Sequence, residues 1–401
     1  MVSITSTEML DSAAPRPRAR WWRGPRFLVE VFDGADEALA ALEAVQSGLT
    51  SQAFLSSTGF QSLNWLTVFY EELALTKRAL PRLVVVTERN SGEVAMILPL
   101  VVKKKRSLRV ARFADLGVSD YGAPILGPAL LVKSRSIRRA WRAVRHALRD
   151  IDMIRLENMP GKIAGRLNPL ISRAGMSPSR YSGNALHIAG RVEDYITGLD
   201  AKDRDALARG VWRWLQEDNP RFARVTTPED VAHAYATLEE QQEAQSSPGD
   251  TKYKFDDPAF RQFYERLVID GTEVELGYLF TLEAGGEIIA ALFGIQHDGT
   301  FTVLRASDAG KPWSDVVPGS LICIEVMKYF VERGVRNFDF GRGDHPFMTE
   351  LMGSDVPLYD LIVARDLAAV PRATFHRVKG RARRNQRLRA FFRRLNRPRA
   401  S

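Results

Sequence analysis

Residues 300–353 carry a strand–helix–strand pattern that constrains the fold more than any other part of the sequence. Apolar residues alternate at period two in TFTVLRASD (300–308), which predicts a strand, and recur near period 3.6 in the segment 320–334, which predicts a helix. Ser320 is a favourable N-cap for that helix, and Gly334 suits the left-handed position after its C-terminus. The run VRNFDFG then predicts a second strand. We therefore expect a βαβ unit, whose helix N-terminus offers unpaired N–H groups to a phosphate or pyrophosphate.

The same order of elements appears a second time within residues 112–160. A strand and loop are followed there by the amphipathic pattern SRSIRRAWRAVRHALRDI and by the strand DMIRLENMP. Each copy follows strong strand signals, including a hairpin with its turn at residues 90–92 and a meander that ends at residue 308. The sequence thus predicts a mixed α/β fold of two similar domains in tandem, residues 27–185 and 186–368.

Composition narrows the cellular setting and the kinds of site that the chain can form. None of the 401 residues falls in an apolar run of about 18 that could span a bilayer, and the N-terminus lacks the apolar segment of a secretory signal. Cys323 is the only cysteine, which excludes an internal disulfide and a thiol-rich metal site. We expect a cytoplasmic protein that binds no metal.

The formal net charge of +9 belongs to the C-terminal end of the chain. Residues 372–401 carry twelve Lys or Arg and no acid, which leaves 9 − 12 = −3 for the first 371 residues. Residues 369–401 are therefore predicted to be a basic tail, whose apolar residues recur at helical spacing and suit an anionic membrane surface at the periphery of the inner membrane. The alternative is a solvated, partly disordered end. Residues 1–26, in which prolines and arginines surround two tryptophans, are predicted to be a flexible basic leader.

Several short motifs together resemble the GCN5-related N-acetyltransferase (GNAT) fold. They are GEIIAALFGI (286–295), the strand TFTVLRASD, the helix start VPGS (317–320) and the strand NFDFGRGDHPF (337–347). More narrowly, the chain resembles the CelD-like acetyltransferases associated with cellulose biosynthesis, which are related to the Fem aminoacyl transferases. The resemblance covers residues 27–365 and includes the duplication.

The resemblance implies acyl transfer from acetyl-coenzyme A or another acyl-coenzyme A. The pyrophosphate of that donor is expected on Val317, Pro318, Gly319 and Ser320. The Arg/Gln-x-x-Gly-x-Gly/Ala loop of single-domain relatives is absent, and Pro318 and Gly319 take its place.

The acid/base candidates lie at the end of the second βαβ unit and are Asp339, Asp344 and His345. A base that deprotonates an amine or hydroxyl needs a pKa near the working pH, which favours His345 with Asp344 to orient it. The alternative is that Asp344 and His345 form a turn and that Asp339 is a buried hydrogen-bond acceptor. The candidates for substrate binding are Arg305, Asp308 and Arg342, together with Asp120 and Tyr121 from the first copy across the domain interface.

The sequence departs from the resembled family at two places. Phe347 and Met348 stand where a Tyr-Lys pair is expected, and the helix over residues 238–245 reads LEEQQEAQ where a His and an Arg are expected. A phenol able to protonate a leaving thiolate is therefore missing at that position.

Three functions follow from these observations. We favour an acyltransferase that acts on an amine or hydroxyl of a sugar, a polysaccharide precursor or another polar acceptor. The second is a degenerate, non-catalytic scaffold that the tail holds at the inner membrane. The third is a Fem-type transferase that takes its acyl group from charged tRNA, in which case the basic tail would contact nucleic acid.

Overall fold

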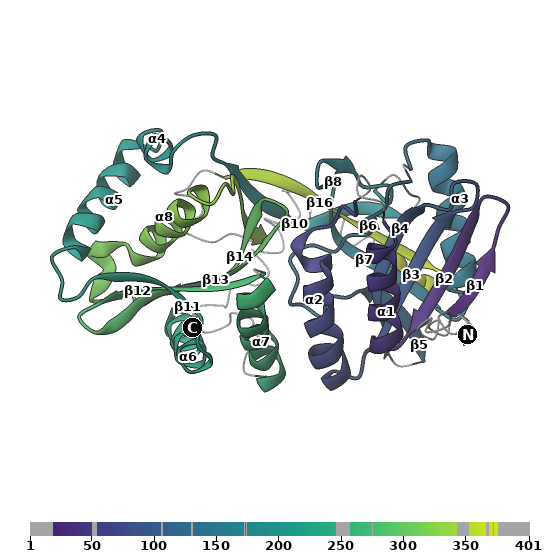
Figure 1. The fold of residues 1–401 in the computed structure, drawn as a ribbon, viewed down its shortest axis with the longest axis horizontal. Coiled ribbons are helices and arrows are strands. Elements are labelled where there is room, and N and C mark those ends of the chain that lie inside the picture. The colour runs from purple at the N-terminus through teal and green to yellow at the C-terminus, as the bar shows by residue number, and fades with distance from the viewer. Residues whose placement is uncertain are drawn as a thin grey trace, which may run out of the picture.

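The chain folds into two units that share one long, mixed β-sheet (Figure 1). The computed structural model describes residues 19–49, 54–105, 107–129, 131–171, 173, 175–245, 257–274, 276–342, 353–365, 369–371 and 373–375. The strand order is β1-β2-β3-β4-β5-β7-β16-β10-β15-β14-β13-β12-β11, with β6 paired to β4.

The N-terminal unit contains a strand, two helices, a three-strand meander, a helix and a strand, with short additions. Its elements are β1 (Ala19–Arg23), β2 (Phe27–Asp33), α1 (Ala35–Ser47), η1 (Gly59–Gln61), α2 (Leu63–Val68), η2 (Phe69–Ala74), β3 (Leu80–Glu88), β4 (Val94–Lys105), β5 (Leu108–Phe113), β6 (Ile125–Leu126), α3 (Ser134–Ala147), β7 (Met153–Pro160), β8 (Lys162–Ile163), β9 (Arg166–Leu167) and β10 (Met176–His187). The central strand β4 is apolar on both faces because α1 and α2 cover one face of the sheet and α3 covers the other.

The C-terminal unit repeats that order. Its elements are α4 (Val192–Thr197), α5 (Ala201–Trp214), β11 (Arg221–Val225), α6 (Pro228–Gln245), α7 (Pro258–Val274), β12 (Gly277–Ala284), β13 (Glu287–His297), β14 (Thr300–Asp308), η4 (Trp313–Val316), α8 (Pro318–Val331), β15 (Asn337–Arg342) and β16 (Ser354–Ala364). The predicted duplication is confirmed, because β5, α3 and β7 correspond to β14, α8 and β15.

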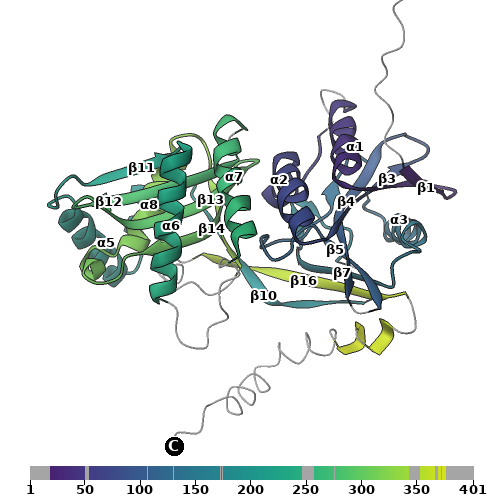
Figure 2. The same cartoon turned by 90° about the horizontal axis from the view of Figure 1, so that it is seen from below.

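The two units exchange their last strands. β10 ends the first unit but pairs with β15 of the second, and β16 ends the second unit but pairs with β7 of the first. β10 and β16 also pair with each other and bridge the two halves (Figure 2). The predicted domain boundary between residues 185 and 186 therefore falls within β10.

A shared apolar core also joins the units. The ring of Trp65 on α2 packs edge-on against Phe263 on α7, with ring centroids 5.1 Å apart. At the rim of this contact, the Arg266 guanidinium lies 2.7 Å from the carboxylates of both Glu71 and Glu72. Packing of α2 and η2 on α7 therefore fixes the position of one unit against the other.

Two sequence predictions about local structure are wrong. The helix of the second βαβ unit begins at Pro318 and not after Ser320, since proline has no N–H to leave unpaired and its fixed φ suits the first helical position. Ala19–Arg23 form β1 instead of a flexible leader, because Arg20 pairs with Asp33 at 2.9 Å and Trp22 stacks on His146 of α3. Residues 1–18 lie outside the described part of the chain, as do residues 376–401 of the predicted tail.

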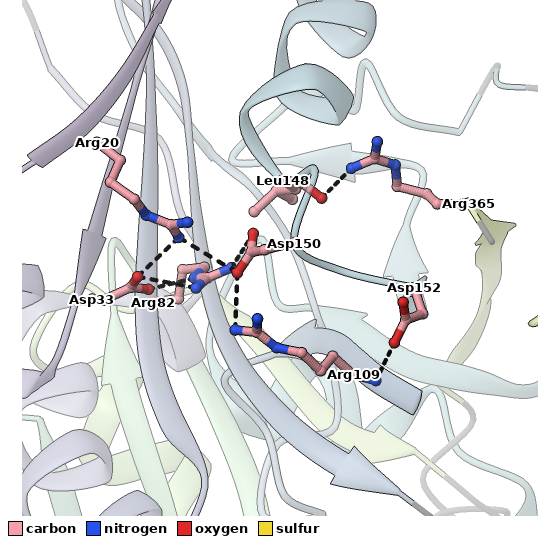
Figure 3. A network of polar contacts seen from close by, with 8 residues as sticks. All are labelled: Arg20, Asp33, Arg82, Arg109, Leu148, Asp150, Asp152 and Arg365. Carbon is pink, nitrogen blue, oxygen red and sulfur yellow. Dashed lines mark hydrogen bonds and ion pairs between the residues drawn. The ribbon is translucent and has the colours of Figure 1, made fainter. Parts of the chain in front are cut away.

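An ion network holds the far end of the N-terminal unit (Figure 3). Arg82, only 1% exposed, donates to Asp33 Oδ2 at 3.0 Å and to Asp150 Oδ1 at 3.1 Å. Arg109 approaches Asp150 at 2.9 Å. Burial works to raise the pKa of Asp150, but Arg82, Arg20 and Arg109 outweigh it and hold that pKa below its usual range. The network therefore ties β1, β2, β3 and β5 to the end of α3.

Candidate functional site

The parallel strands β14 and β15 separate after a short paired stretch. They are in register only from Thr300 to Thr302, opposite Asn337 to Asp339. Leu304 is an extra residue in β14, because Gly294 pairs with Val303 while Phe293 pairs with Arg305. A bulge of this kind bends a strand and increases its twist, so the two strands diverge beyond it. The result is a fork whose base lies at Asp339.

The start of α8 lies beyond this fork. Val317, the residue before the helix, has φ +48°, and Pro318 occupies the first helical position. The N–H of Gly319 makes no backbone hydrogen bond within the described residues, and it adds to the positive end of the helix dipole. The helix start is held from one side by α5, since a Cβ on Gly210 would come within 2.4 Å of the Val316 carbonyl oxygen. Residues 317–320 thus combine a backbone N–H group with the positive end of the helix dipole, two features that suit a phosphate group, while Pro318, Gly319 and Ser320 are buried.

The corresponding fork in the N-terminal unit is filled by its own loop. β5 and β7 are paired only from Val110 to Arg112, as in the second unit. The loop after β5 then crosses beside β7, where Gly122 N–H donates to the Asn158 carbonyl oxygen at 3.3 Å. A Cβ on Gly122 would come within 2.7 Å of the Glu157 carbonyl oxygen. Within the described residues, a loop therefore fills the fork between β5 and β7, whereas none fills the fork between β14 and β15.

The same loop carries two predicted site residues to the base of the other fork. Tyr121 Oη donates to Asp339 Oδ1 at 2.7 Å. The same carboxylate oxygen accepts the Gly341 N–H at 2.8 Å. Arg342 Nε lies 3.7 Å from Asp120 Oδ1, with both side chains 20% exposed. Asp120, Tyr121, Asp339 and Arg342 together are the junction cluster, and the structure brings three of the predicted substrate-binding residues into it.

Backbone geometry makes room for this cluster. Gly341 has φ +74°, and a Cβ there would lie 2.2 Å from Asp120 Oδ2. Gly183 on β10 is equally close, since a Cβ would lie 2.2 Å from the Tyr121 hydroxyl. Gly341 therefore lets the Asp120 side chain of the first unit reach the backbone of the second, and Gly183 leaves room for the Tyr121 hydroxyl within the first unit.

Burial shifts the acid/base properties of the junction cluster. It raises the pKa of Asp120 to about 7, with Arg342 opposing the rise and Asp339 adding to it. Burial also raises the pKa of Asp339 to about 6, against the hydrogen bonds from Tyr121 and Gly341. The pKa of Tyr121 is raised well above its usual value by burial and by the Asp339 charge. The carboxyl groups of Asp120 and Asp339 thus change between their protonated and ionised forms near neutral pH.

Arg305 and Asp308 lie in a different environment from the junction cluster. Arg305 is 4% exposed, donates through Nε to Gln242 Oε1 at 3.0 Å and lies 3.5 Å from Glu239. The Asp308 carboxylate accepts from Gln245 Nε2 at 2.9 Å and from the Gly310 N–H at 2.9 Å. The glutamines of the LEEQQEAQ segment therefore attach α6 to β14, which gives a structural role to residues that replace the expected His and Arg.

The predicted catalytic pair, Asp344 and His345, lies outside the described residues, as do Phe347 and Met348. Asp339, which the sequence offers either as an acid/base candidate or as a buried acceptor, is the carboxylate that contacts Tyr121. Tyr181, whose ring lies 4.7 Å from the Arg342 guanidinium, was not predicted. Its position on β10 depends on the strand exchange, for which the sequence carries no local signal.

Comparison with known proteins identifies the fold. Residues 201–348 match the family model of the acetyltransferase (GNAT) domain. The crystal structure of FemX is similar, with a TM-score of 0.56 and 12% identity over 84% of this chain and 98% of its own. A conserved protein of unknown function from Bacteroides thetaiotaomicron has a TM-score of 0.51 and 11% identity over 82% of this chain and 97% of its own. None of the curated proteins compared matches the chain. Both structures are covered almost completely, so the likeness extends to the two-unit arrangement.

Proposed function

Because residues 201–348 match the acetyltransferase (GNAT) domain family, we propose that the chain transfers an acyl group from acyl-coenzyme A to an amine or hydroxyl. The donor is acetyl-coenzyme A or a related thioester, and its diphosphate lies against residues 317–320. The observation that carries the proposal is the fork between β14 and β15, because it combines a helix N-terminus on one side with the junction carboxylates at its base.

The residues at the helix start fit the diphosphate of such a donor. The unpaired Gly319 N–H and the dipole of α8 favour negative charge there. Beyond the bulge at Leu304, β14 has no strand partner on the β15 side within the described residues. The carbonyl oxygens of Ala306 and Asp308 accept there from Gln242 and Gln245 of α6. An extended arm with amide groups, such as that of coenzyme A, can therefore pair with this edge through its N–H groups only.

The junction cluster supplies the proton chemistry of the proposed reaction. Attack by an amine nitrogen on the thioester carbon forms a C–N bond and breaks the C–S bond, so the nitrogen loses a proton and the leaving sulfur gains one. Asp339, with a pKa raised to about 6, accepts the proton of the amine. Tyr121 donates its proton to the sulfur and takes the one held by Asp339, which leaves both residues as they began. Tyr121 thus protonates the leaving sulfur, which Phe347 cannot do because it has no hydroxyl.

The acceptor is proposed to be a polar molecule such as an amino sugar or a polysaccharide precursor. Support comes from the groups at the junction, where two carboxyls, a phenol and a guanidinium can all hydrogen-bond to a polyhydroxylated substrate. We place the protein in the cytoplasm or at the periphery of the inner membrane, with the basic tail on an anionic surface. Within the described residues, none of the helices has the length and apolar character needed to span a membrane.

Turnover of acetyl-coenzyme A tests the proposal. Free thiol is measured in the presence of a panel of amino sugars, with the wild-type chain and with Asp339→Asn. Asparagine keeps an oxygen that accepts from Tyr121 and Gly341, but it cannot take a proton. We expect acceptor-dependent thiol release that falls by about 10²- to 10⁴-fold in Asp339→Asn. Equal rates for the two proteins would contradict the assignment of the base.

A further inference from the structure

The outer face of α3 is an unusually basic surface. Residues 134–149 contain six arginines and no aspartate or glutamate, so this segment carries a formal charge of +6. All six arginines are exposed, whereas Ile137, Ala140, Trp141 and Val144 are buried against the sheet. The arginines are Arg135, Arg138, Arg139, Arg142, Arg145 and Arg149. At 1.5 Å per residue they form a stripe roughly 20 Å long.

These arginines differ from many other arginines in the described part of the chain, because no carboxylate of the described residues pairs with them. Ion pairs within 4.0 Å neutralise arginines across both units, such as Arg26 with Glu88, Arg221 with Glu283 and Arg266 with Glu71. None of the α3 arginines has such a pair within the described residues. The nearest acid in the sequence, Asp150, is already in contact with three other arginines (Figure 3). The positive charge of α3 is therefore available to a partner.

The end of β16 lies next to this helix. β16 ends beside the C-terminus of α3, where Arg365 donates to the Leu148 carbonyl oxygen (Figure 3). The chain then packs Ala369 and Ala373 against β5 and β7, and the basic residues 372–401 follow from there. The described part of the chain thus ends close to β5 and β7, on the N-terminal unit.

We propose that the α3 face docks on a membrane surface rich in anionic phospholipid. Arginine guanidinium groups bind lipid phosphates in bidentate fashion. An exposed apolar side chain accompanies the charge, since Val132 just before α3 is 72% exposed. Apolar contact with acyl chains combined with basic contact to headgroups is the pattern of a peripheral membrane surface. An RNA contact would instead favour aromatic side chains available for base stacking on this helix, and its one large aromatic residue, Trp141, is buried. The docking does not depend on the proposed acyl transfer.

Vesicle binding by the full chain tests this proposal. The variant Arg138→Gln/Arg139→Gln/Arg142→Gln is compared with the wild type in flotation with vesicles of phosphatidylcholine and phosphatidylglycerol. Each basic side chain near an anionic surface strengthens binding about fivefold, so the triple variant should bind roughly a hundredfold more weakly. Vesicles of phosphatidylcholine alone should bind neither protein. Because the three side chains are exposed and unpaired, the variant should keep the wild-type melting temperature.

The control removes the same charge from the other unit, as Lys202→Gln/Arg209→Gln/Arg333→Gln, and should bind vesicles like the wild type. Wild-type vesicle binding by the α3 variant would overturn the proposal and assign docking to the tail. Loss of binding to a labelled single-stranded RNA, with vesicle binding unchanged, would also overturn it and make the α3 face a nucleic-acid surface. Equal losses of vesicle binding in the α3 variant and the control would mean that net charge alone drives the binding. That result would contradict docking through the α3 face.

Discussion

Replacing Asp120 by asparagine should change how the stability of the protein depends on pH. In the folded chain the pKa of Asp120 is raised by burial from 3.8 to about 7. The native state therefore binds this proton more tightly than the unfolded chain does. The contribution of Asp120 to stability is complete below its usual pKa and is lost as the pH rises through about 7. Asparagine cannot ionise, so Asp120→Asn should be spared this loss.

The size of the effect follows from the change in pKa. A rise from 3.8 to about 7 corresponds to a ceiling of about 4 kcal/mol of stability that is lost on ionisation. The side chain is 20% exposed, so solvent reduces this cost. We expect Asp120→Asn to gain about 2 kcal/mol relative to the wild type between about pH 4 and about pH 7.

Denaturant unfolding across this pH range measures the difference directly. The matched control is Asp315→Asn, which removes a carboxylate whose side chain is 71% exposed and should leave the pH dependence as in the wild type. Parallel curves for Asp120→Asn and the wild type would refute the reasoning, because they would show that Asp120 ionises in the folded protein as it does in the unfolded chain.

Two further substitutions test the structural basis of the junction and of the ion network. Gly341→Ala should lower the free energy of unfolding by about 2 kcal/mol, since φ is +74° and the new Cβ would lie 2.2 Å from Asp120 Oδ2. Gly310→Ala, with φ +63° and no neighbour within 4 Å, should cost only about 1 kcal/mol in the same measurement, and equal losses would contradict the contact. Arg82→Met should cost about 3 kcal/mol in thermal unfolding because it leaves two carboxylates without their buried partner. Arg20→Met, at a half-exposed site, should cost less than about 1 kcal/mol, and a loss as large as that of Arg82→Met would refute this ranking.

Local patterns in the sequence predicted most elements of the fold. The period-two alternation of TFTVLRASD gives β14 with the same bounds, and the arginine-rich amphipathic pattern gives α3. The helix start was misplaced because Ser320 resembles an N-cap, whereas Pro318 at the first helical position decides where α8 begins.

The exchange of β10 and β16 could not be predicted from the sequence. Each strand has the composition of an ordinary strand, and the identity of its partner depends on contacts that are distant in the chain. The contact between Tyr121 and Asp339 depends on this exchange, because it requires the two units to meet at β15. Sequence reasoning placed Asp120 and Tyr121 at the interface, but it could not select Asp339 over Asp344 and His345.

The central claim is that residues 317–320 bind the diphosphate of an acyl-coenzyme A donor, and calorimetric titration with acetyl-coenzyme A tests it. Val317 has φ +48°, a conformation that asparagine and aspartate adopt more readily than valine, so Val317→Asn and Val317→Asp should both fold. The two variants have the same shape, but only aspartate places a negative charge at the helix start. We predict that the wild type and Val317→Asn bind the donor, and that Val317→Asp binds at least about tenfold more weakly, a loss of about 1.4 kcal/mol. Equal binding by the two variants, or no binding by the wild type at about millimolar donor, would contradict the account.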